Sequence, residues 1–378
     1  MHLAVVASSS PFSKASWSGI PFFATREIQR RFAKVTVIDT PRVDRLLVKA
    51  HKFATGRIQL LREPMIVDLY ARYLDRMLRK IGADAVVSIG APHKIAGLLD
   101  RWPVVHVTDA MFDTIVRYYP KYEAMHSRSM RMGHALQRRI VERSAGLLVA
   151  SRWAARSAAQ HYDQPETTFT VAPMGANFET PPPPPAMRTN AGPLKLLFAG
   201  YDWDRKGGPL VLAILEVLRR SEPEAQLHIV GSTPRAAVGQ AGVTLHGPLS
   251  KSDPHQARLF ESLFADAHFF CMPSHQEAYG LVYCEACAYG LPPVARDTGG
   301  VGEIVKHGEN GLLLPPDAGA ETYAHAILDI WGDAQAYRSM QANARQAFEA
   351  RLNWQAWGAS LETVLQGAIQ QGGLRGRP

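Results

Sequence analysis

Long apolar runs and cysteines are both scarce in this chain. No run of the 378 residues approaches the roughly 18 to 20 apolar residues that span a bilayer. The apolar stretch at residues 3–7 is too short for the core of a secretory signal peptide. Only three cysteines occur, bunched at Cys271, Cys284 and Cys287, so no disulfide framework is predicted. The sequence therefore indicates a soluble, cytoplasmic protein.

Three common nucleotide-enzyme and hydrolase motifs are also missing. No G-x-G-x-x-G follows the first apolar run, and neither G-x-x-x-x-G-K-[ST] nor G-x-S-x-G occurs anywhere. The sequence therefore lacks the motifs that would predict an NAD-dependent dehydrogenase, a P-loop kinase or an α/β-hydrolase.

Short apolar runs typical of buried strands alternate with longer helical patterns along the whole chain. This alternation predicts an α/β protein with parallel sheets built from βαβ units. The length exceeds the roughly 100 to 200 residues of one domain, and five consecutive prolines at residues 181–185 interrupt the pattern. We expect two Rossmann-like, doubly wound domains facing a central cleft. The expected strands are residues 3–7, 35–38, 85–89, 104–107, 147–150 and 169–172, then 194–198, 227–230, 268–272, 293–295 and 312–314.

Positive charge is concentrated in the first half of the chain. Residues 1–180 hold 26 Lys and Arg against 15 Asp and Glu, whereas the remainder is slightly acidic. The pattern fits either a solvated helical face or attraction to an anionic membrane surface or acidic glycan. Nucleic acid is not expected, because no recognition motif accompanies the charge. The basic residues that crowd two segments are Lys49, Lys52, Arg57 and Arg62, then Arg128, Arg131, Arg138, Arg139, Arg143, Arg152 and Arg156.

The segment 271–290 carries the most informative chemistry. A buried strand runs into a polar loop, Gly280 begins a helix, and Gly290 ends it. The start of a helix binds anions such as a diphosphate, because its N–H groups are free and its dipole is positive there. Glu277 precedes this helix, and Glu285 lies about 7 to 8 Å further along its axis. The two carboxylates could therefore hold sugar and ribose hydroxyls on either side of the diphosphate.

These residues resemble the signature of the family-4 retaining glycosyltransferases, the glycosyl transferases group 1 of the GT-B superfamily, in their bacterial form. Glu277 and Glu285 match the family's two glutamates separated by seven residues, and the flanking E-A-Y-G-L and E-A-C-A-Y-G-L-P match as well. Further blocks of the family follow in order over about 120 residues. They are Leu197-Phe-Ala-Gly200, Arg205-Lys-Gly-Gly208, Thr298-Gly-Gly-Val-Gly-Glu303 and His307-Gly-Glu-Asn-Gly311.

The resemblance implies a role for each matching residue in the second domain. Arg205 and Lys206 would neutralise the donor diphosphate as it leaves. Glu277 would hold the hydroxyls of the transferred sugar, and Glu285 those of the ribose. Glu303 would either meet the donor or cap its own helix. The backbone N–H groups expected to face the phosphate or sugar are those of Tyr279, Gly280 and Leu281.

In the first domain the resemblance rests on fewer residues. Gly19, in Ser16-Trp-Ser-Gly19, takes the place of the family's glycine-rich loop, where a small residue lets the backbone approach the donor phosphate. His106 matches a histidine near the sugar and acceptor, although a lone strand histidine is commonly structural. Asp109 would be its partner on the acceptor side or a helix cap. Asn177 is expected to be structural.

The resemblance also implies the domain roles and the reaction. Residues 1–180 would bind the acceptor, 181–190 would form a proline-rich linker, 191–350 would bind the nucleotide-sugar, and 351–378 would pack back on the first domain. The reaction would transfer a hexose-type sugar, with retention, from a UDP- or GDP-linked donor to a glycan, lipid-linked or small-molecule acceptor. No metal or other cofactor is expected, and the enzyme would lie in the cytoplasm or at the inner face of the membrane. A sugar-nucleotide epimerase and a non-catalytic sugar-nucleotide binding module remain alternatives.

Two local patterns imitate metal sites. Asp202-Trp-Asp204 resembles a metal-binding D-x-D, but Arg205 and Lys206 follow at once and would compete with a metal for the diphosphate. His275-x-Glu277 with Cys284-x-x-Cys287 imitates a zinc deaminase, a remote alternative. The six residues between Glu277 and Cys284 are too few for the two helices that such a site uses.

Overall fold

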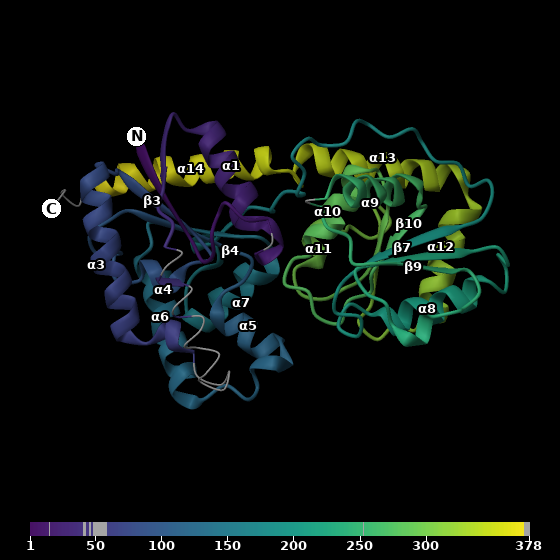
Figure 1. The fold of residues 1–378 in the computed structure, drawn as a ribbon, viewed down its shortest axis with the longest axis horizontal. Coiled ribbons are helices and arrows are strands. Elements are labelled where there is room, and N and C mark those ends of the chain that lie inside the picture. The colour runs from purple at the N-terminus through teal and green to yellow at the C-terminus, as the bar shows by residue number, and fades with distance from the viewer. Residues whose placement is uncertain (15, 41–42, 45–46, 48–58, 252, 374–378) are drawn as a thin grey trace. The chain divides into compact units, whose positions relative to one another are not determined.

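The computed structural model describes residues 1–14, 16–40, 43–44, 47, 59–251 and 253–373 of the chain. It divides into two compact units (Figure 1). The first comprises Met1–Asn177 with Trp354–Pro378, and the second comprises Phe178–Asn353. Among the described residues, none of the helices combines the length and apolar character that crossing a membrane requires.

The first unit is built on a six-stranded parallel sheet in the order β2-β1-β3-β4-β5-β6. β1, β3 and β4 are buried at every residue, as expected for strands covered on both faces. The sixth strand is two residues long, shorter than the run 169–172 predicts. The strands are β1 (His2–Ala7), β2 (Lys34–Val37), β3 (Ala85–Ile89), β4 (Val104–Thr108), β5 (Gly146–Val149) and β6 (Thr170–Val171).

Helices connect these strands and cover the sheet. They are η1 (Trp17–Gly19), α1 (Ile20–Arg31), η2 (Leu60–Arg62), α3 (Pro64–Ile81), α4 (Pro92–Ile95), α5 (Phe112–Tyr118), η3 (Pro120–Tyr122), α6 (Ser127–Arg143), α7 (Arg152–Tyr162), η4 (Glu166–Thr168) and α14 (Trp354–Gly373). Although α14 ends the described chain, it lies beside α1 and contacts β4 and β5 (Figure 1). Gly358 permits this approach, because a Cβ there would lie 2.5 Å from Glu27 Oε1.

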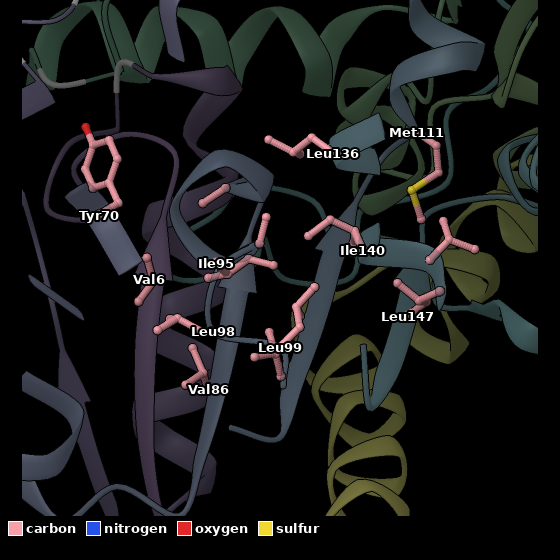
Figure 2. Packing of buried hydrophobic residues seen from close by; sticks show 14 of the residues in the cluster. Val6, Tyr70, Val86, Ile95, Leu98, Leu99, Met111, Leu136, Ile140 and Leu147 are labelled. Carbon is pink, nitrogen blue, oxygen red and sulfur yellow. The ribbon is translucent and has the colours of Figure 1, made fainter. Parts of the chain in front are cut away.

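One hydrophobic core of the first unit lies between the sheet and helices α3, α4, α6 and α7. Figure 2 shows Val6 and Val86 of the sheet near Ile95, Leu98 and Leu99 of the segment that follows β3. Ala4 and Val6 belong to this cluster while Leu3 and Val5 do not, as the twofold alternation of a strand requires. The periodic burial fixes which face of each strand meets the helices.

The second unit repeats the architecture with the sheet order β12-β11-β10-β7-β8-β9, also parallel. Its strands are β7 (Lys195–Ala199), β8 (Gln226–Val230), β9 (Val243–Gly247), β10 (Phe269–Cys271), β11 (Pro293–Arg296) and β12 (Leu312–Leu314). Its helices are α8 (Gly208–Leu218), η5 (Arg235–Ala237), α9 (Pro254–Asp266), α10 (Leu281–Ala288), α11 (Val301–Ile304), α12 (Ala320–Gly332) and α13 (Ala334–Ala350). The two parallel sheets confirm the predicted fold class. The edge strand β9 was not predicted, because Thr244 and His246 interrupt its apolar pattern.

The proline-rich stretch is fixed to the second unit. Arg345 Nη1 donates to the carbonyl oxygen of Pro182 at 3.0 Å. Arg188 donates to the carbonyls of Phe264 and Tyr289, each at 2.9 Å. Gln341 holds the Arg188 backbone in both directions, accepting from its N–H and donating to its carbonyl. These bonds explain why the boundary between the two units falls after Asn177, before the prolines begin.

Candidate nucleotide-sugar site

The start of α10 is shaped by a glycine. Gly280 adopts the left-handed conformation with φ +95° at the N-cap of α10. A Cβ at this position would lie 2.6 Å from the ring of Tyr283, which is itself buried and donates its hydroxyl to the Met272 carbonyl at 2.5 Å. A larger residue would therefore displace the first turn of the helix. The N–H groups at the start of a helix suit an anion, and binding of a diphosphate at this turn stays a prediction.

A second glycine turn places two basic residues beside the loop that precedes α10. Gly207 has φ +80°, and a Cβ there would collide with the Pro273 carbonyl oxygen at the end of the β10 segment. Arg205 Nη1 donates to the Gln276 carbonyl at 2.9 Å, and the His275 N–H donates to the Arg205 carbonyl at 2.8 Å. The loops that follow β7 and β10 are thus joined by one side-chain-to-backbone bond and one backbone-to-backbone bond.

This junction pairs Lys206 with Glu277. Lys206 Nζ donates to Glu277 Oε2, and the two side chains are 15% and 12% exposed. The Glu277 carbonyl also accepts from the Gly300 N–H at 3.1 Å. The structure therefore brings together Arg205, Lys206 and Glu277, which lie about seventy residues apart in the chain.

Glu285 has a different cationic partner. Lys251 Nζ lies 2.6 Å from Glu285 Oε1, with the glutamate side chain 6% exposed and the lysine 40% exposed. Lys251 also lies over the ring of Phe260, 4.7 Å from its centroid. The sequence prediction missed Lys251 because it follows β9, the strand that was not predicted. The sequence feature that could have identified Lys251 is a basic residue in the loop after a strand of the same sheet, where ligands bind.

Tyr279 and Leu281 can offer only backbone groups to a ligand. Both side chains are buried, and the Tyr279 hydroxyl accepts from Cys284 Sγ at 3.7 Å. Burial raises the pKa of Tyr279 well above its usual value, so the phenol stays neutral. Glu303 lies in the first turn of α11 and is buried. That position favours a carboxylate through the helix dipole, with or without a donor contact.

The two metal-like patterns have other partners. Asp202 Oδ2 accepts from Arg205 Nε at 2.9 Å, so this carboxylate orients the basic turn. Cys287 Sγ accepts from Asn310 Nδ2 at 3.8 Å, and burial raises the pKa values of both Cys284 and Cys287. Within the part of the chain that the structure describes, these cysteines join no cluster of metal-ligating side chains. The zinc-deaminase alternative therefore has no assembled site.

In the first unit, the loop after β1 follows an unusual backbone path. Trp17, Ser18 and Gly19 have φ values of +45°, +52° and +81°, and Gly19 forms the N-cap of α1. Left-handed backbone costs a non-glycine residue about 1 kcal/mol or more, so surrounding contacts must hold this turn. Asn177 supplies one, because its Nδ2 donates to the Ser18 carbonyl while its Oδ1 accepts from Trp354 Nε1 at 3.0 Å. Asn177 thus fastens both the loop and α14.

The Trp17 ring connects the loop to Asp109. Trp17 Nε1 donates to Asp109 Oδ2 at 3.3 Å, and a Cβ on Gly90 would lie 2.5 Å from the ring. Asp109 Oδ1 also accepts from the Ala110 N–H at 2.8 Å. Asp109 follows the carboxyl end of β4, where ligands of such sheets bind. It does not cap α5, whose N-cap is Met111.

His106 lies inside the sheet, two residues before the end of β4. It is 1% exposed, and its Nδ1 lies 3.0 Å from the Ser88 hydroxyl of β3. Burial lowers its pKa to about 4, so the imidazole is neutral at pH 7. These observations favour a structural histidine, and its predicted contact with sugar and acceptor stays a prediction.

Much of the basic character of the first unit is paired. Arg128 binds Glu63 at 2.8 Å, and Arg156 lies 3.7 Å from Glu166. Arg139 pairs with Asp100 and donates to the Ala96 carbonyl at 2.9 Å. These ion pairs favour a solvated helical face, and attraction to an anionic membrane surface or acidic glycan stays a prediction. Lys49, Lys52 and Arg57 lie outside the described residues.

Comparison with solved structures identifies the fold of the chain. The chain aligns over 98% of its length, and 100% of the other chain, with sucrose-phosphate synthase from Thermosynechococcus elongatus, at a TM-score of 0.69 and 17% identity. It aligns over 97% of its length, and 100% of the other chain, with Anabaena HepE in complex with UDP and glucose, at a TM-score of 0.65 and 15% identity. The fold is therefore GT-B.

The family follows from the sequence of the second unit. Residues 193–333 match the model of the glycosyl transferases group 1. The D-inositol 3-phosphate glycosyltransferase of Jonesia denitrificans is 30% identical over 272 residues, which cover 65% of this chain and 62% of that protein. The match thus spans less than two thirds of that relative. The chain carries a domain of the glycosyl transferases group 1, which confirms the family predicted from the sequence.

Proposed function

We propose that this chain is a metal-independent, retaining glycosyltransferase that moves a hexose-type sugar from a UDP- or GDP-linked donor to an acceptor. The observation that carries the proposal is the Lys206–Glu277 pair beside the glycine-shaped start of α10. A lysine, an arginine and the N–H groups at the start of a helix suit a diphosphate. The adjacent carboxylate suits sugar hydroxyls.

In the proposed reaction, binding of the donor breaks the Lys206–Glu277 ion pair and gives each of the two residues a new partner. Lys206 moves from Glu277 to the diphosphate, and Arg205 joins it in neutralising the negative charge that develops as the glycosidic bond breaks. Glu277 then accepts hydrogen bonds from the sugar, and Glu285, held by Lys251, accepts them from the ribose. Backbone N–H groups of Tyr279, Gly280 and Leu281 face the phosphate or sugar.

The acceptor attacks from the side on which the diphosphate leaves, so the anomeric configuration is retained. A leaving phosphate oxygen takes the acceptor proton, so no protein base is required. In the first unit, Gly19 would allow close approach to the donor phosphate, and Asp109 would meet the acceptor. His106, already bonded to Ser88, would act near the sugar only through its other ring nitrogen.

A transfer assay tests the proposal against its alternatives. The full-length protein is incubated with UDP-glucose or GDP-mannose and EDTA, with and without glycan, lipid-linked and small polyol-phosphate acceptors, and products are analysed by mass spectrometry and NMR. Acceptor-dependent transfer with retention supports it. An altered sugar nucleotide formed without acceptor indicates an epimerase. Nucleotide binding without turnover in any mixture indicates a binding module.

Two named relatives guide the choice of substrates. The UDP and glucose in the HepE complex make UDP-glucose the first donor to test. D-inositol 3-phosphate, named for the Jonesia relative, is an anionic small molecule that suits a basic first domain, and we include it among the acceptors. Contact with an anionic membrane surface stays a prediction, which sedimentation with anionic and neutral vesicles would test.

A further inference from the structure

Three side chains in the first unit converge without any part in the proposed reaction. Asp113 lies in the first turn of α5, His134 lies on α6, and His161 lies in the last turn of α7. One ligand atom from each lies within 4.8 Å of the other two. His161 Nδ1 is 2.8 Å from Asp113 Oδ2, and His134 Nδ1 is 3.7 Å from Asp113 Oδ1. The two imidazole rings lie 5.2 Å apart, centroid to centroid.

The cluster contains buried polar atoms whose hydrogen bonding is incomplete. The Asp113 side chain is 3% exposed. Among the described residues, neither Asp113 Oδ1 nor His134 Nδ1 has a hydrogen-bond partner, although the Arg117 guanidinium forms an ion pair with Oδ1 at 3.0 Å. Burial makes incomplete hydrogen bonding of such atoms unfavourable. A metal ion would satisfy both atoms at once.

The donor set selects a class of metal. Two imidazoles and one carboxylate suit zinc, cobalt or nickel, whereas magnesium and calcium prefer oxygen ligands. Zinc bonds of about 2.0 to 2.2 Å in a tetrahedron place ligand atoms about 3.3 Å apart. The distances of 2.8 and 3.7 Å end on different oxygens of Asp113, and one ligand atom from each residue lies within 4.8 Å of the other two, so small side-chain movements would bring the three atoms to that spacing.

We propose that Asp113, His134 and His161 bind a divalent transition-metal ion, with zinc as the physiological candidate. The ion would join α5, α6 and α7 and would leave its fourth position to water. We assign the ion a structural role, because none of its three ligands is among the residues of the proposed reaction and all three join helices of one unit. The bound ion would stabilise the folded chain by mass action.

Nearby guanidinium groups would repel a bound cation and so lower the affinity of this site for metal. Arg117 competes directly for Asp113 Oδ1, but its side chain is 70% exposed and can move into solvent. Arg62 and Arg138 also act on His134 through their positive charge. Arg62 lies over the ring of Phe112, 4.0 Å from its centroid, and cannot withdraw as easily because it is half-buried and its Nη1 atom is enclosed. Removing Arg117 should therefore tighten metal binding.

Cobalt titration of the metal-stripped, full-length protein tests this site. We expect one Co²⁺ per chain, visible absorption bands of a nitrogen- and oxygen-ligated ion, and displacement of cobalt by zinc. His161→Ala should reduce affinity at least a hundredfold, and the exposed His325→Ala, a matched control, should leave it unchanged. Arg117→Ala should raise affinity about tenfold, since it removes a unit charge about 5 Å from a divalent ion in near-aqueous dielectric.

The Arg117→Ala variant keeps the test decisive if a histidine variant fails to fold. Absence of stoichiometric cobalt binding would overturn the site, as would unchanged or weaker binding in folded Arg117→Ala. A sulfur-to-cobalt charge-transfer band would place the ion at Cys284 and Cys287 and would overturn it equally.

Discussion

Replacing Glu277 by Gln should have opposite effects on nucleotide binding and on sugar transfer. In the free protein the Glu277 carboxylate holds Lys206, and both side chains are mostly buried. The amide of glutamine would release Lys206 for the diphosphate and would remove a negative charge beside it. A partly buried pair of this kind is worth about 1 kcal/mol, so UDP without a sugar should bind about fivefold more tightly.

The same change should weaken transfer. A glutamine amide accepts weaker hydrogen bonds from the sugar than a carboxylate, and a hydrogen bond to a charged group is worth about 1.5 to 3 kcal/mol. Loss of that stabilisation in the transition state should reduce kcat/KM about tenfold to a hundredfold.

Two assays on the same preparations separate these effects. Isothermal titration measures UDP affinity, and initial rates of donor consumption measure kcat/KM. Glu216→Gln, at an exposed position of α8, serves as the matched control and should change neither quantity. Weaker UDP binding by Glu277→Gln together with unaltered kcat/KM would refute the partner exchange proposed for Lys206.

Three further changes probe other parts of the account. Gly280→Ala should lower nucleotide affinity at least tenfold and destabilise the fold by about 2 kcal/mol, because φ +95° and the Tyr283 ring both oppose a Cβ; calorimetry and thermal unfolding measure the two effects. Lys251→Met should weaken UDP binding about threefold without a change in kcat, since Lys251 only orients Glu285; a kcat loss would contradict this role. Burial lowers the folded pKa of His106 to about 4, below its unfolded value, so it opposes stability increasingly as pH falls from about 6.5 towards 4. Between pH 6.5 and 4 the free energy of unfolding should therefore fall by about 3 kcal/mol less in His106→Gln than in the wild type. Urea unfolding at each pH measures this difference. An equal fall in both proteins would show that His106 is not buried in its neutral form.

The sequence predicted the elements whose signals are local. Runs such as 85–89 are apolar throughout, because strands covered on both faces need no polar side, and the structure has a strand at that position. Gly280 was predicted to begin α10, and its positive φ gives the physical reason. The edge strand β9 escaped because an edge strand tolerates Thr244 and His246, which dilute the apolar pattern.

Contacts between distant segments could not be predicted from local patterns. The Lys206–Glu277 pair depends on β7 and β10 being neighbours in the sheet, so family resemblance predicted the residues but not their bond. Trp17 and Gly90 meet because β1 pairs with β3. The Asp113, His134 and His161 cluster requires the packing of three helices, none of which carries a recognisable metal motif.

The most direct test of the central claim is calorimetric titration of the full-length protein with UDP and GDP in excess EDTA, repeated with Glu285→Gln. The proposed site predicts selective binding of one nucleotide that persists in EDTA and weakens about tenfold in the variant, because the ribose loses a charged acceptor. Binding of neither nucleotide, or binding of equal strength in Glu285→Gln, would contradict the assignment of α10 and its two glutamates as the donor site.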